Sequence, residues 1–302
     1  MKPKSPIVSG QGLPAARDKG RRNRFPLEKP HLPAPARGLP NLHASVMAQG
    51  ILDGKPTIWL LPEEVPVSIH IDSAAYAVMM ATPADLEDFA IGFVLSEGLV
   101  AHASHIRNVL VIPSGEGWTA DIAVAEGKLL RERMALRSLE GRAGCGLCGI
   151  TEMEQVIRMP QTHAGAARPR LDPAAVARAF DSLPSFQPMN AVNRTVHAAA
   201  WCQADGSILL AREDVGRHNA LDKLIGALLR GGTDPSSGFA AVTSRASYEM
   251  VHKAAAAGIP LLSAVSAPTA LAVRTARDAG LTLIGFARQD RHTVYASPHS
   301  NF

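Results

Sequence analysis

Cysteine is scarce in this chain, with only three among 302 residues. Three cysteines are too few for a fold held by disulfides, and they fit a reducing compartment, so we expect a cytoplasmic protein. Long apolar runs are also missing, because none reaches the roughly 18 to 20 residues that a membrane span needs. The N-terminus lacks the apolar stretch of a secretory signal peptide. These absences argue against secreted disulfide scaffolds and against membrane-spanning proteins.

Acidic residues are few in the first 50 positions. Nine Lys and Arg side chains there accompany only Asp18 and Glu28, which gives +7, whereas the whole chain carries +4. The remainder is therefore slightly acidic, and it offers no basic excess for binding nucleic acid. The same 50 residues hold eight of the 22 prolines. We expect residues 1–53 to form a disordered, basic, proline-rich tail, and ordered structure to begin near Thr57.

Residues 54–168 are expected to form a smaller α+β subdomain. The segment 57–72 indicates strands that are interrupted at Pro62 and Pro66. A helix is predicted to begin at Thr82, which can cap it, and to end at Gly98. The other elements expected here are strands over 105–113 and 119–126 and a short helix over 151–159.

Residues 169–302 show short apolar strands that alternate with helices. This alternation is typical of an α/β domain with a largely parallel sheet, in which helices cover both faces. A helix over 169–183, opened by Asp172 and Pro173, precedes the sheet. The segment 196–202 is a helix or a strand. The remaining predicted elements are strands over 207–213, 239–244, 259–266 and 281–287, and helices over 218–232, 248–258 and 268–280.

Cys145 and Cys148 form a C-x-x-C pair in the stretch RAGCGLCGI, residues 142–150. A structural zinc ion needs four ligands, and only Cys202 remains, with no second ligand pair, so no metal is expected. A dithiol–disulfide switch suits the spacing. However, three glycines within residues 144–149 favour a loop that moves. Movement suits a thiol that accepts a group at one place and delivers it at another. The alternative interpretation, a turn with two cysteines that have no chemical role, is not excluded at this point.

A dense polar segment covers residues 211–226, at a predicted junction between a strand and a helix. Ligands of open α/β sheets bind where the carboxyl ends of the strands meet the following helices. We therefore interpret the segment as a ligand-facing or catalytic surface. The alternative is a helix start held by ion pairs. The polar side chains concerned are Arg212, Asp214, Arg217, His218, Asn219, Asp222 and Lys223.

Two later strand–helix junctions are also polar. The segment 243–250 offers backbone N–H groups at a helix start, together with Arg245 and Ser247, and this combination suits an anion. In the next junction Ser266 or Thr269 can cap the following helix. Simple capping is an alternative interpretation of either junction.

The last strand is followed by the polar segment 285–291. Here Phe286 could stack on a base, while Arg288 or Arg291 could pair with phosphate. Because the carboxyl ends of parallel strands meet at one edge of a sheet, we expect these junctions to lie along the same edge.

The motifs taken together resemble the FdhD family, the formate dehydrogenase accessory sulfurtransferases. The resemblance runs from about Thr57 to the C-terminus. The segments that carry it are TPADLEDFAIGFVLSEG (82–98), CGLCG (145–149), REDVGRHNALDKLIG (212–226), SYEMVHKA (247–254), SAPTALA (266–272) and LTLIGFAR (281–288).

The resemblance implies a cytoplasmic homodimer whose C-terminal domain has a cytidine-deaminase-like, three-layer α/β/α fold without zinc. It also implies transfer of sulfur, carried as a cysteine persulfide, from a cysteine desulfurase to the bis-molybdopterin guanine dinucleotide cofactor before that cofactor enters formate dehydrogenase. Cys145 matches the persulfide-bearing cysteine, and Cys148 matches its partner in the motif. The residues that match the segment binding the guanine dinucleotide cofactor are Gly285, Phe286, Ala287, Arg288, Gln289 and Asp290.

The chain departs from the family pattern in two places. Residues 193–197, Asn-Arg-Thr-Val-His, stand where T-G-G-V-H is usual, and Ser244 stands where a glycine is usual. Both departures bear on backbone geometry near the expected pocket. Two other functions remain open at this point: a guanine dinucleotide cofactor chaperone whose cysteines are not catalytic, and a thiol–disulfide oxidoreductase.

Overall fold

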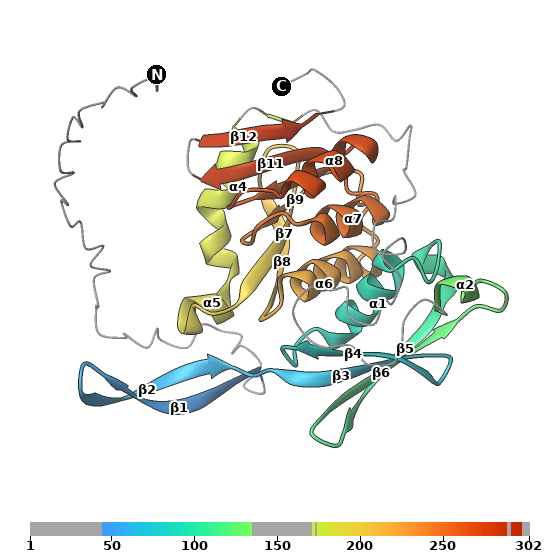
Figure 1. Cartoon of the computed structure of the whole chain (residues 1–302), viewed down its shortest axis with the longest axis horizontal. Helices are drawn as coiled ribbons and strands as arrows, with labels where there is room; N and C mark the ends of the chain where they lie inside the picture. Colours follow the sequence, from blue (N-terminus) through green and yellow to red (C-terminus); the bar gives the residue numbers. More distant parts are fainter. Residues whose placement is uncertain (1–43, 135–170, 173, 289–290, 298–302) are drawn as a thin grey trace, which may run out of the picture. The chain divides into compact units, whose positions relative to one another are not determined.

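The computed structural model of the chain describes residues 44–134, 171–172, 174–288 and 291–297. Residues 40–302 form one compact unit. The helices and strands, labelled as in Figure 1, are β1 (Ser45–Leu52), β2 (Lys55–Pro62), β3 (Val65–Ile71), β4 (Ala74–Ala81), α1 (Leu86–Ser96), η2 (Ala103–His105), β5 (Ile106–Ser114), β6 (Gly117–Val124), α2 (Arg131–Met134), α4 (Ala175–Ser182), η3 (Leu183–Phe186), α5 (Pro188–Asn193), β7 (His197–Cys202), β8 (Ile208–Asp214), α6 (Arg217–Arg230), β9 (Phe239–Val242), α7 (Tyr248–Ala256), β10 (Leu261–Ala264), α8 (Ala270–Asp278), β11 (Thr282–Arg288) and β12 (Arg291–Ala296).

The first two strands form a hairpin that begins inside the segment expected to be a tail. β1 pairs antiparallel with β2 over their full length. The tail boundary at residue 53 and the start of order near Thr57 are therefore wrong. The proline-rich, basic composition ends near Pro40, whereas Ser45–Leu52 is free of charge. Asp53 and Gly54 have φ angles of 49° and 80°, as a two-residue type I′ hairpin turn requires.

A four-stranded sheet has the order β4-β3-β6-β5, with β3 parallel to β6. Pro66 lies within β3 opposite Met80, so the chain is interrupted after Pro62 but not at Pro66 as predicted. Pro66 is tolerated because it is the second residue of its strand and precedes the pairing of β3 with β6, which starts at Val67.

Helix α1 begins at Leu86, four residues later than the prediction. Asp85 has φ 53° and ψ 38°, a left-handed conformation that prevents the helix from extending back to Thr82. Thr82 is buried and contacts another segment instead, since its Oγ1 accepts a hydrogen bond from the backbone N–H of Val215 at 3.1 Å. Thr82 therefore ties two distant parts of the chain together and does not cap the helix.

The second large sheet has six strands in the order β12-β11-β10-β9-β7-β8. β9, β10 and β11 are mutually parallel, and β8 runs in the same direction because both β8 and β9 are antiparallel to β7. The predicted strands after residue 206 are confirmed, and the ambiguous segment 196–202 is the strand β7. As a result, the carboxyl ends of four strands meet at one edge of the sheet.

Two helical layers cover the faces of this sheet. Ala199 and Trp201 of β7 belong to the same hydrophobic cluster as the side chains of α6, α7 and α8. The alternate residues Ala200 and Cys202 belong to a second cluster, which includes α4. Figure 1 shows α6, α7 and α8 beside one another. The expected three-layer α/β/α arrangement is therefore confirmed, although α4 begins only at Ala175, three residues after Asp172.

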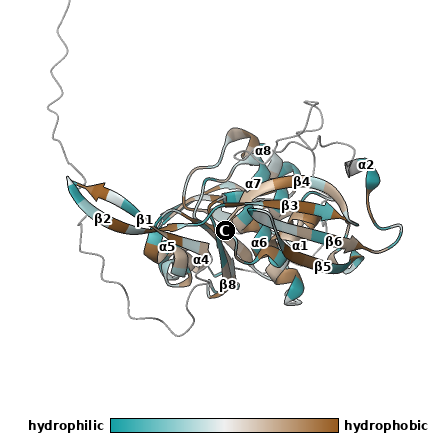
Figure 2. Ribbon diagram, turned by 90° about the horizontal axis from the view of Figure 1, so that it is seen from below, coloured by the Kyte–Doolittle hydropathy of each residue, from teal (hydrophilic) through white to brown (hydrophobic). Residues whose placement is uncertain are grey.

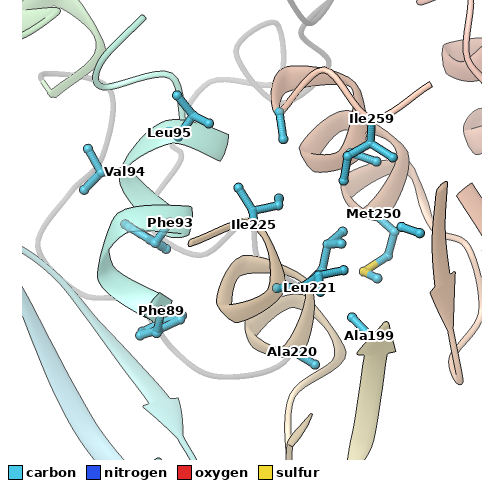
Figure 3. Close-up of a cluster of buried hydrophobic side chains, with 14 of the residues drawn as sticks. Phe89, Phe93, Val94, Leu95, Ala199, Ala220, Leu221, Ile225, Met250 and Ile259 are labelled. Atoms are coloured by element: carbon cyan, nitrogen blue, oxygen red, sulfur yellow. The ribbon is translucent and has the colours of Figure 1, made fainter. Parts of the chain in front are cut away.

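Helices α1 and α6 cross closely and join the parts of the chain expected to be separate domains. Phe89 and Phe93 of α1 and Ile225 of α6 belong to one buried hydrophobic cluster, which lies between the two helices (Figure 3). A Cβ atom added to Gly92 would overlap the backbone of α6, and one added to Gly226 would overlap the backbone of α1. The glycines thus permit the close approach, and residues on both sides of position 168 share a core.

A helix can cross a membrane only when about 20 consecutive residues are predominantly apolar. Among the described residues, no helix is long and apolar enough to cross a membrane.

Candidate functional site

Much of the polar segment 211–226 is buried and structural. Nζ of Lys223 lies 2.6 Å from Oδ2 of Asp214, and neither side chain is exposed to solvent. The same ammonium group donates to the backbone carbonyl of Thr82 at 3.0 Å. Asp214 also accepts hydrogen bonds from the N–H groups of Thr82 and Gly216 and from the side chain of Asn219. The carboxylate is thus paired with a charge and surrounded by donors, as a buried ion pair requires.

A second buried ion pair joins α6 to α7. Nζ of Lys253 lies 2.9 Å from Oδ2 of Asp222, and Oγ of Ser96 donates to the other carboxylate oxygen at 2.7 Å. Burial raises the pKa of Asp222, while Lys253 and Ser96 favour its charged form. Lys253 also lies 5.4 Å from the centre of the Phe93 ring. This cluster fixes α1, α6 and α7 to one another.

A third cluster of ion pairs covers the outer side of the α1–α6 contact. Asp88 contacts both Arg212, at 2.8 Å, and Arg230, at 2.7 Å. The ligand-facing interpretation is therefore wrong for Arg212, Asp214, Asn219, Asp222 and Lys223, and the alternative of a helix start held by ion pairs is correct. Arg217 and His218 have a different position and are the residues of this segment that remain as site candidates.

The polar junctions do gather at one sheet edge, as predicted. The loops after β8, β9 and β10 leave the sheet at the same edge, and β7 begins there at His197. The second and third loops contact each other, since Ala246 and Pro268 form a β-bridge. The N–H of Phe286 in β11 donates to the carbonyl of Ser266 at 3.3 Å. The candidate site is therefore a row of loops that runs from β8 to β11.

In the described part of the chain, the buried Nε of Arg217 at this edge has no hydrogen-bond partner, whereas His218 and Ser247 both lie beside the carboxylate of Glu249. His218 Nε2 lies 3.8 Å from Oε2 of Glu249. Burial alone would raise the pKa of Glu249, but His218 and Ser247 beside it bring that pKa down to about 2. Burial, Arg217 and His218 lower the pKa of His197. At neutral pH this part of the sheet edge therefore holds the ionised carboxylate of Glu249 and a neutral His197.

Near β11 the row contains a strained aromatic residue. Phe286 has φ 53° and lies in an irregularity of the β11–β12 pairing. Its side chain is 49% exposed, and its ring centre is 6.5 Å from that of Tyr295. A Cβ at Gly285 would come within 2.8 Å of Pro268, so glycine is needed for the close approach of this strand to the neighbouring loop. Strained backbone held in this way is common at binding sites.

The other candidate residues beside this edge interact mainly with backbone groups close to them in the sequence. Thr269 caps α8, since its Oγ1 accepts from the N–H of Ala272 at 3.2 Å. Ser247 precedes α7 in an N-cap position but makes no side-chain cap bond. Ser244 is buried, and its hydroxyl donates to the carbonyl of Arg245 at 3.0 Å. Arg194, at one of the usual glycine positions of the family pattern, has φ 55°, which explains why glycine suits that position.

The predicted site residues are only partly described. Gly285, Phe286, Ala287 and Arg288 lie in β11, with Ala287 buried and Arg288 exposed. Cys145, Cys148, Gln289 and Asp290, together with the helix predicted over 151–159, lie outside the described residues.

The remaining cysteine, Cys202, is described and is unsuited to thiol chemistry. It is fully buried at the end of β7, and burial raises its pKa to about 12. Because the thiolate is the nucleophilic form, a thiol with this pKa is inert at neutral pH. Cys202 is therefore a core residue.

The sequence pattern assigns Glu249 no role of its own, although it lies in the segment 243–250 interpreted as a seat for an anion. For His197 the sequence leaves two interpretations, a structural residue or a ligand contact. The signal for Glu249 was its place in the first turn of α7, where a carboxylate faces the positive end of the helix. Nothing in the sequence links Glu249 to His218, which lies 31 positions earlier.

Comparison with known proteins gives consistent results. The model of the FdhD/NarQ family matches residues 62–301. The chain is 52% identical over 239 residues to the sulfur carrier protein FdhD of Xanthomonas campestris pv. campestris strain B100, covering 79% of this chain and 84% of that protein. It is 51% identical over 236 residues to the sulfur carrier protein FdhD of Variovorax paradoxus, covering 78% and 84%.

A solved structure supports the same assignment. The crystal structure of a protein from Desulfotalea psychrophila, described as a formate dehydrogenase accessory protein, matches with a TM-score of 0.68 at 25% identity. The match covers 84% of this chain and 98% of that one. With the three-layer fold and the sequence identity in agreement, the chain belongs to the FdhD/NarQ family.

Proposed function

We propose that this chain is a sulfurtransferase, which carries sulfur as a cysteine persulfide from a cysteine desulfurase to the bis-molybdopterin guanine dinucleotide cofactor for formate dehydrogenase. The observation that carries the proposal is the 52% identity to a protein named as a sulfur carrier. The chemistry of the cysteines supports it. Cys202 is buried with a raised pKa, which leaves Cys145 and Cys148 as the thiols able to carry sulfur.

The loading step is a thiol attack on a persulfide. The thiolate of Cys145 attacks the outer sulfur of the donor's Cys–S–SH group, a new S–S bond forms on Cys145, and the bond between the two donor sulfurs breaks. The donor cysteine leaves as a thiolate. The result is a persulfide on Cys145, with no net oxidation or reduction in the exchange.

The delivery step uses the second cysteine. The thiolate of Cys148 attacks the inner sulfur of the Cys145 persulfide, forms a disulfide with Cys145 and releases the outer sulfur as sulfide for the acceptor. The outer sulfur gains two electrons, and the two cysteines supply them. A cellular thiol reductant then restores the dithiol. The glycines of residues 144–149 suit a segment that serves a donor and an acceptor in turn.

The sheet edge is the proposed seat of the cofactor, which is the substrate of this reaction. Its residues fit a guanine dinucleotide, because the exposed ring of Phe286 offers a stacking surface for a base. The exposed Arg288 supplies a cation for phosphate. The buried Nε of Arg217, which has no hydrogen-bond partner among the described residues, would be satisfied by an acceptor atom of a ligand. Gln289 and Asp290 complete the proposed set, Gly285 to Asp290.

Phe286→Ala is expected to weaken guanosine diphosphate binding about tenfold, because a base stacked on an aromatic ring contributes roughly 1–3 kcal/mol. Isothermal titration of the full chain with guanosine diphosphate measures this effect. Phe186→Ala is the matched control, since Phe186 is also exposed and lies on η3, a different segment. Equal affinities of the two variants would remove Phe286 from the proposed seat.

A Cys145→Ala/Cys148→Ala variant is expected to bind guanosine diphosphate normally and to leave formate dehydrogenase immature. The reason is that the cysteines carry the sulfur, whereas different residues, at the sheet edge, bind the cofactor. The measurement is formate dehydrogenase activity in cells that lack the native accessory protein, with nucleotide titration of the purified variant. Full maturation by this variant would instead favour a cofactor chaperone whose cysteines are not catalytic.

A further inference from the structure

The end of the loop row near β8 holds a cluster of polar side chains, of which the proposed function assigns a role only to Arg217. The cluster is called the polar corner below. Its members come from the start of β7, the first turn of α6 and the start of α7. Figure 2 shows hydrophilic as well as hydrophobic residues along α6, and the corner lies at the N-terminal end of this helix. The members are His197, Arg217, His218, Ser247 and Glu249.

The polar corner is separate from the proposed seat of the base. In the sheet, β9 and β10 lie between β7, which begins at His197, and β11, which carries Phe286. Three strand spacings of about 4.8 Å separate β7 from β11, which amounts to roughly 14 Å along the edge. A ligand whose base stacks on Phe286 therefore has that base well away from the corner. Chemistry at the corner is thus distinct from recognition of the base.

The ion pair of the polar corner differs from the structural ion pairs of the chain. The buried carboxylates of Asp88, Asp214 and Asp222 are each paired with Lys or Arg, which keep their charge near neutral pH. Glu249 is paired with a histidine instead, since Nε2 of His218 lies 3.8 Å from its Oε2. A histidine takes up and gives up a proton near neutral pH. The corner therefore combines a carboxylate with a group that can exchange protons.

Positive charge gathers at the polar corner. Burial lowers the pKa of His197, and the charges of Arg217 and His218 lower it further. The buried Nε of Arg217 has no hydrogen-bond partner among the described residues. The N-cap of α6 is Gly216, which has no side chain to cap the first turn, so the positive end of the helix dipole adds to this charge. The corner therefore suits a small anion.

Two carboxylates lie close to this positive charge. Asp214, which also acts on His197, is already paired with Lys223. Burial alone would raise the pKa of Glu249, but hydrogen bonds from neighbouring side chains bring it down to about 2, so Glu249 stays ionised at neutral pH. Glu249 balances the charge of a protonated His218. The net charge of the corner is then positive, and it is carried by the guanidinium group.

The delivery of sulfur, as proposed above, requires a proton. The terminal S–H group of a persulfide is more acidic than a thiol, so the outer sulfur is mainly an anion at neutral pH. Its departure as S²⁻ would produce an extremely basic dianion, whereas its departure as HS⁻ needs one proton. A general acid that gives up its proton near neutral pH supplies that proton and accelerates such a step by about 10²–10⁴-fold.

We propose that the polar corner is the acid–base site of sulfur delivery, in which Arg217 binds the anionic outer sulfur and His218 protonates it. The inference rests on the proposed function. As the thiolate of Cys148 attacks the inner sulfur, the bond between inner and outer sulfur breaks. The outer sulfur takes the electron pair of that bond and the proton of His218, and it leaves as HS⁻. The disulfide of Cys145 and Cys148 remains, and the imidazole regains its proton from water. Glu249 positions the imidazole and balances its charge.

The pH profile of sulfide release tests this role. The full chain is loaded with sulfur by a cysteine desulfurase and separated from it, and the released sulfide is measured as methylene blue. The wild-type rate should pass through a maximum between about pH 6 and 8, because the step needs both a protonated histidine and a thiolate. His218→Gln should load sulfur normally, release it at least about 100-fold more slowly, and show a rate that rises steadily with pH as the thiolate of Cys148 forms. His102→Gln, at an exposed histidine beside η2, is the matched control and should keep the wild-type profile.

Two further variants separate catalysis from a purely structural role. Added imidazole should raise the release rate of His218→Ala and leave that of the wild type unchanged. Glu249→Gln should move the falling side of the pH profile to lower pH, because the carboxylate favours the protonated imidazole. This variant also tests the pair if substitution of His218 prevents folding.

The outcomes distinguish this inference from the proposed function. A wild-type rate and pH maximum in His218→Gln, no response of His218→Ala to imidazole, or an unchanged profile in Glu249→Gln would each overturn the acid–base role. Failure of His218→Gln to load sulfur would place the residue before delivery and would overturn it as well. Failure of the wild type to load sulfur would overturn the proposed function itself, because loading precedes the step assigned to the polar corner.

Discussion

Lys223→Met is expected to lower the free energy of unfolding by about 3–5 kcal/mol, the usual cost of removing one partner from a buried ion pair. The substitution leaves the carboxylate of Asp214 without a counter-charge at a position closed to solvent. It also removes the donor to the backbone carbonyl of Thr82, which ties the loop before α1 to the middle of α6. Urea denaturation followed by tryptophan fluorescence and circular dichroism measures the change.

Two controls accompany this prediction. Lys128→Met removes a lysine that is exposed, and it should change the midpoint of denaturation little. Asp214→Asn combined with Lys223→Met removes both charges and should recover part of the lost stability, because no unpaired charge is left buried. If Lys223→Met unfolds at the same urea concentration as Lys128→Met, the buried pair does not hold the two parts of the chain together.

Cys145→Ala is expected to abolish sulfur loading and, with it, maturation of formate dehydrogenase. Cys148→Ala is expected to load sulfur normally and to deliver it poorly, with maturation reduced at least about tenfold, because the thiol that attacks the inner sulfur is missing. The measurements are persulfide content after incubation with a cysteine desulfurase, and formate dehydrogenase activity in cells that depend on the variant.

The two single variants separate the roles of the cysteines. Normal delivery by Cys148→Ala would show that the acceptor takes sulfur directly from the Cys145 persulfide. Loading of Cys145→Ala to the wild-type level would transfer the carrier role to Cys148. Ser replacements at the same two positions provide polar controls of similar size, and they should behave like the alanine variants, since a hydroxyl does not carry sulfur.

The regular part of the fold could be predicted from the sequence. Strands such as β9 and β10 are short, fully buried and mostly apolar, and they are bounded by helices with clear starts and ends, so local composition determines them. The shared edge of the loops after β8, β9 and β10 followed from the parallel order of the strands.

The function of the polar segment 211–226 could not be determined from the sequence. Asp214 and Lys223 form a buried ion pair beside Thr82, and each also makes a hydrogen bond to the backbone of Thr82. Thr82 lies more than 130 positions earlier in the chain. A ligand-binding surface and a buried ion-pair cluster use the same residue types at the same kind of junction. Only the packing of α1 against α6 distinguishes the two.

The first strand, β1, was not predicted, for a different reason. The first 50 residues as a whole are rich in proline and basic side chains, and this overall composition conceals the apolar strand Ser45–Leu52. The Asp53-Gly54 dipeptide between two apolar runs is a strong hairpin signal, and it was available in the sequence. Among the described residues β1 has β2 as its one neighbouring strand, and this pairing is visible only in the structure.

The sulfur-carrier proposal is tested most directly by the mass of the cysteine-containing peptides after the full chain has been incubated with a cysteine desulfurase and cysteine. The proposal predicts a gain of about 32 Da, one sulfur atom, on the peptide that contains Cys145, and reversal of that gain by a thiol reductant. No gain on either Cys145 or Cys148, or a gain on the buried Cys202 alone, would contradict it.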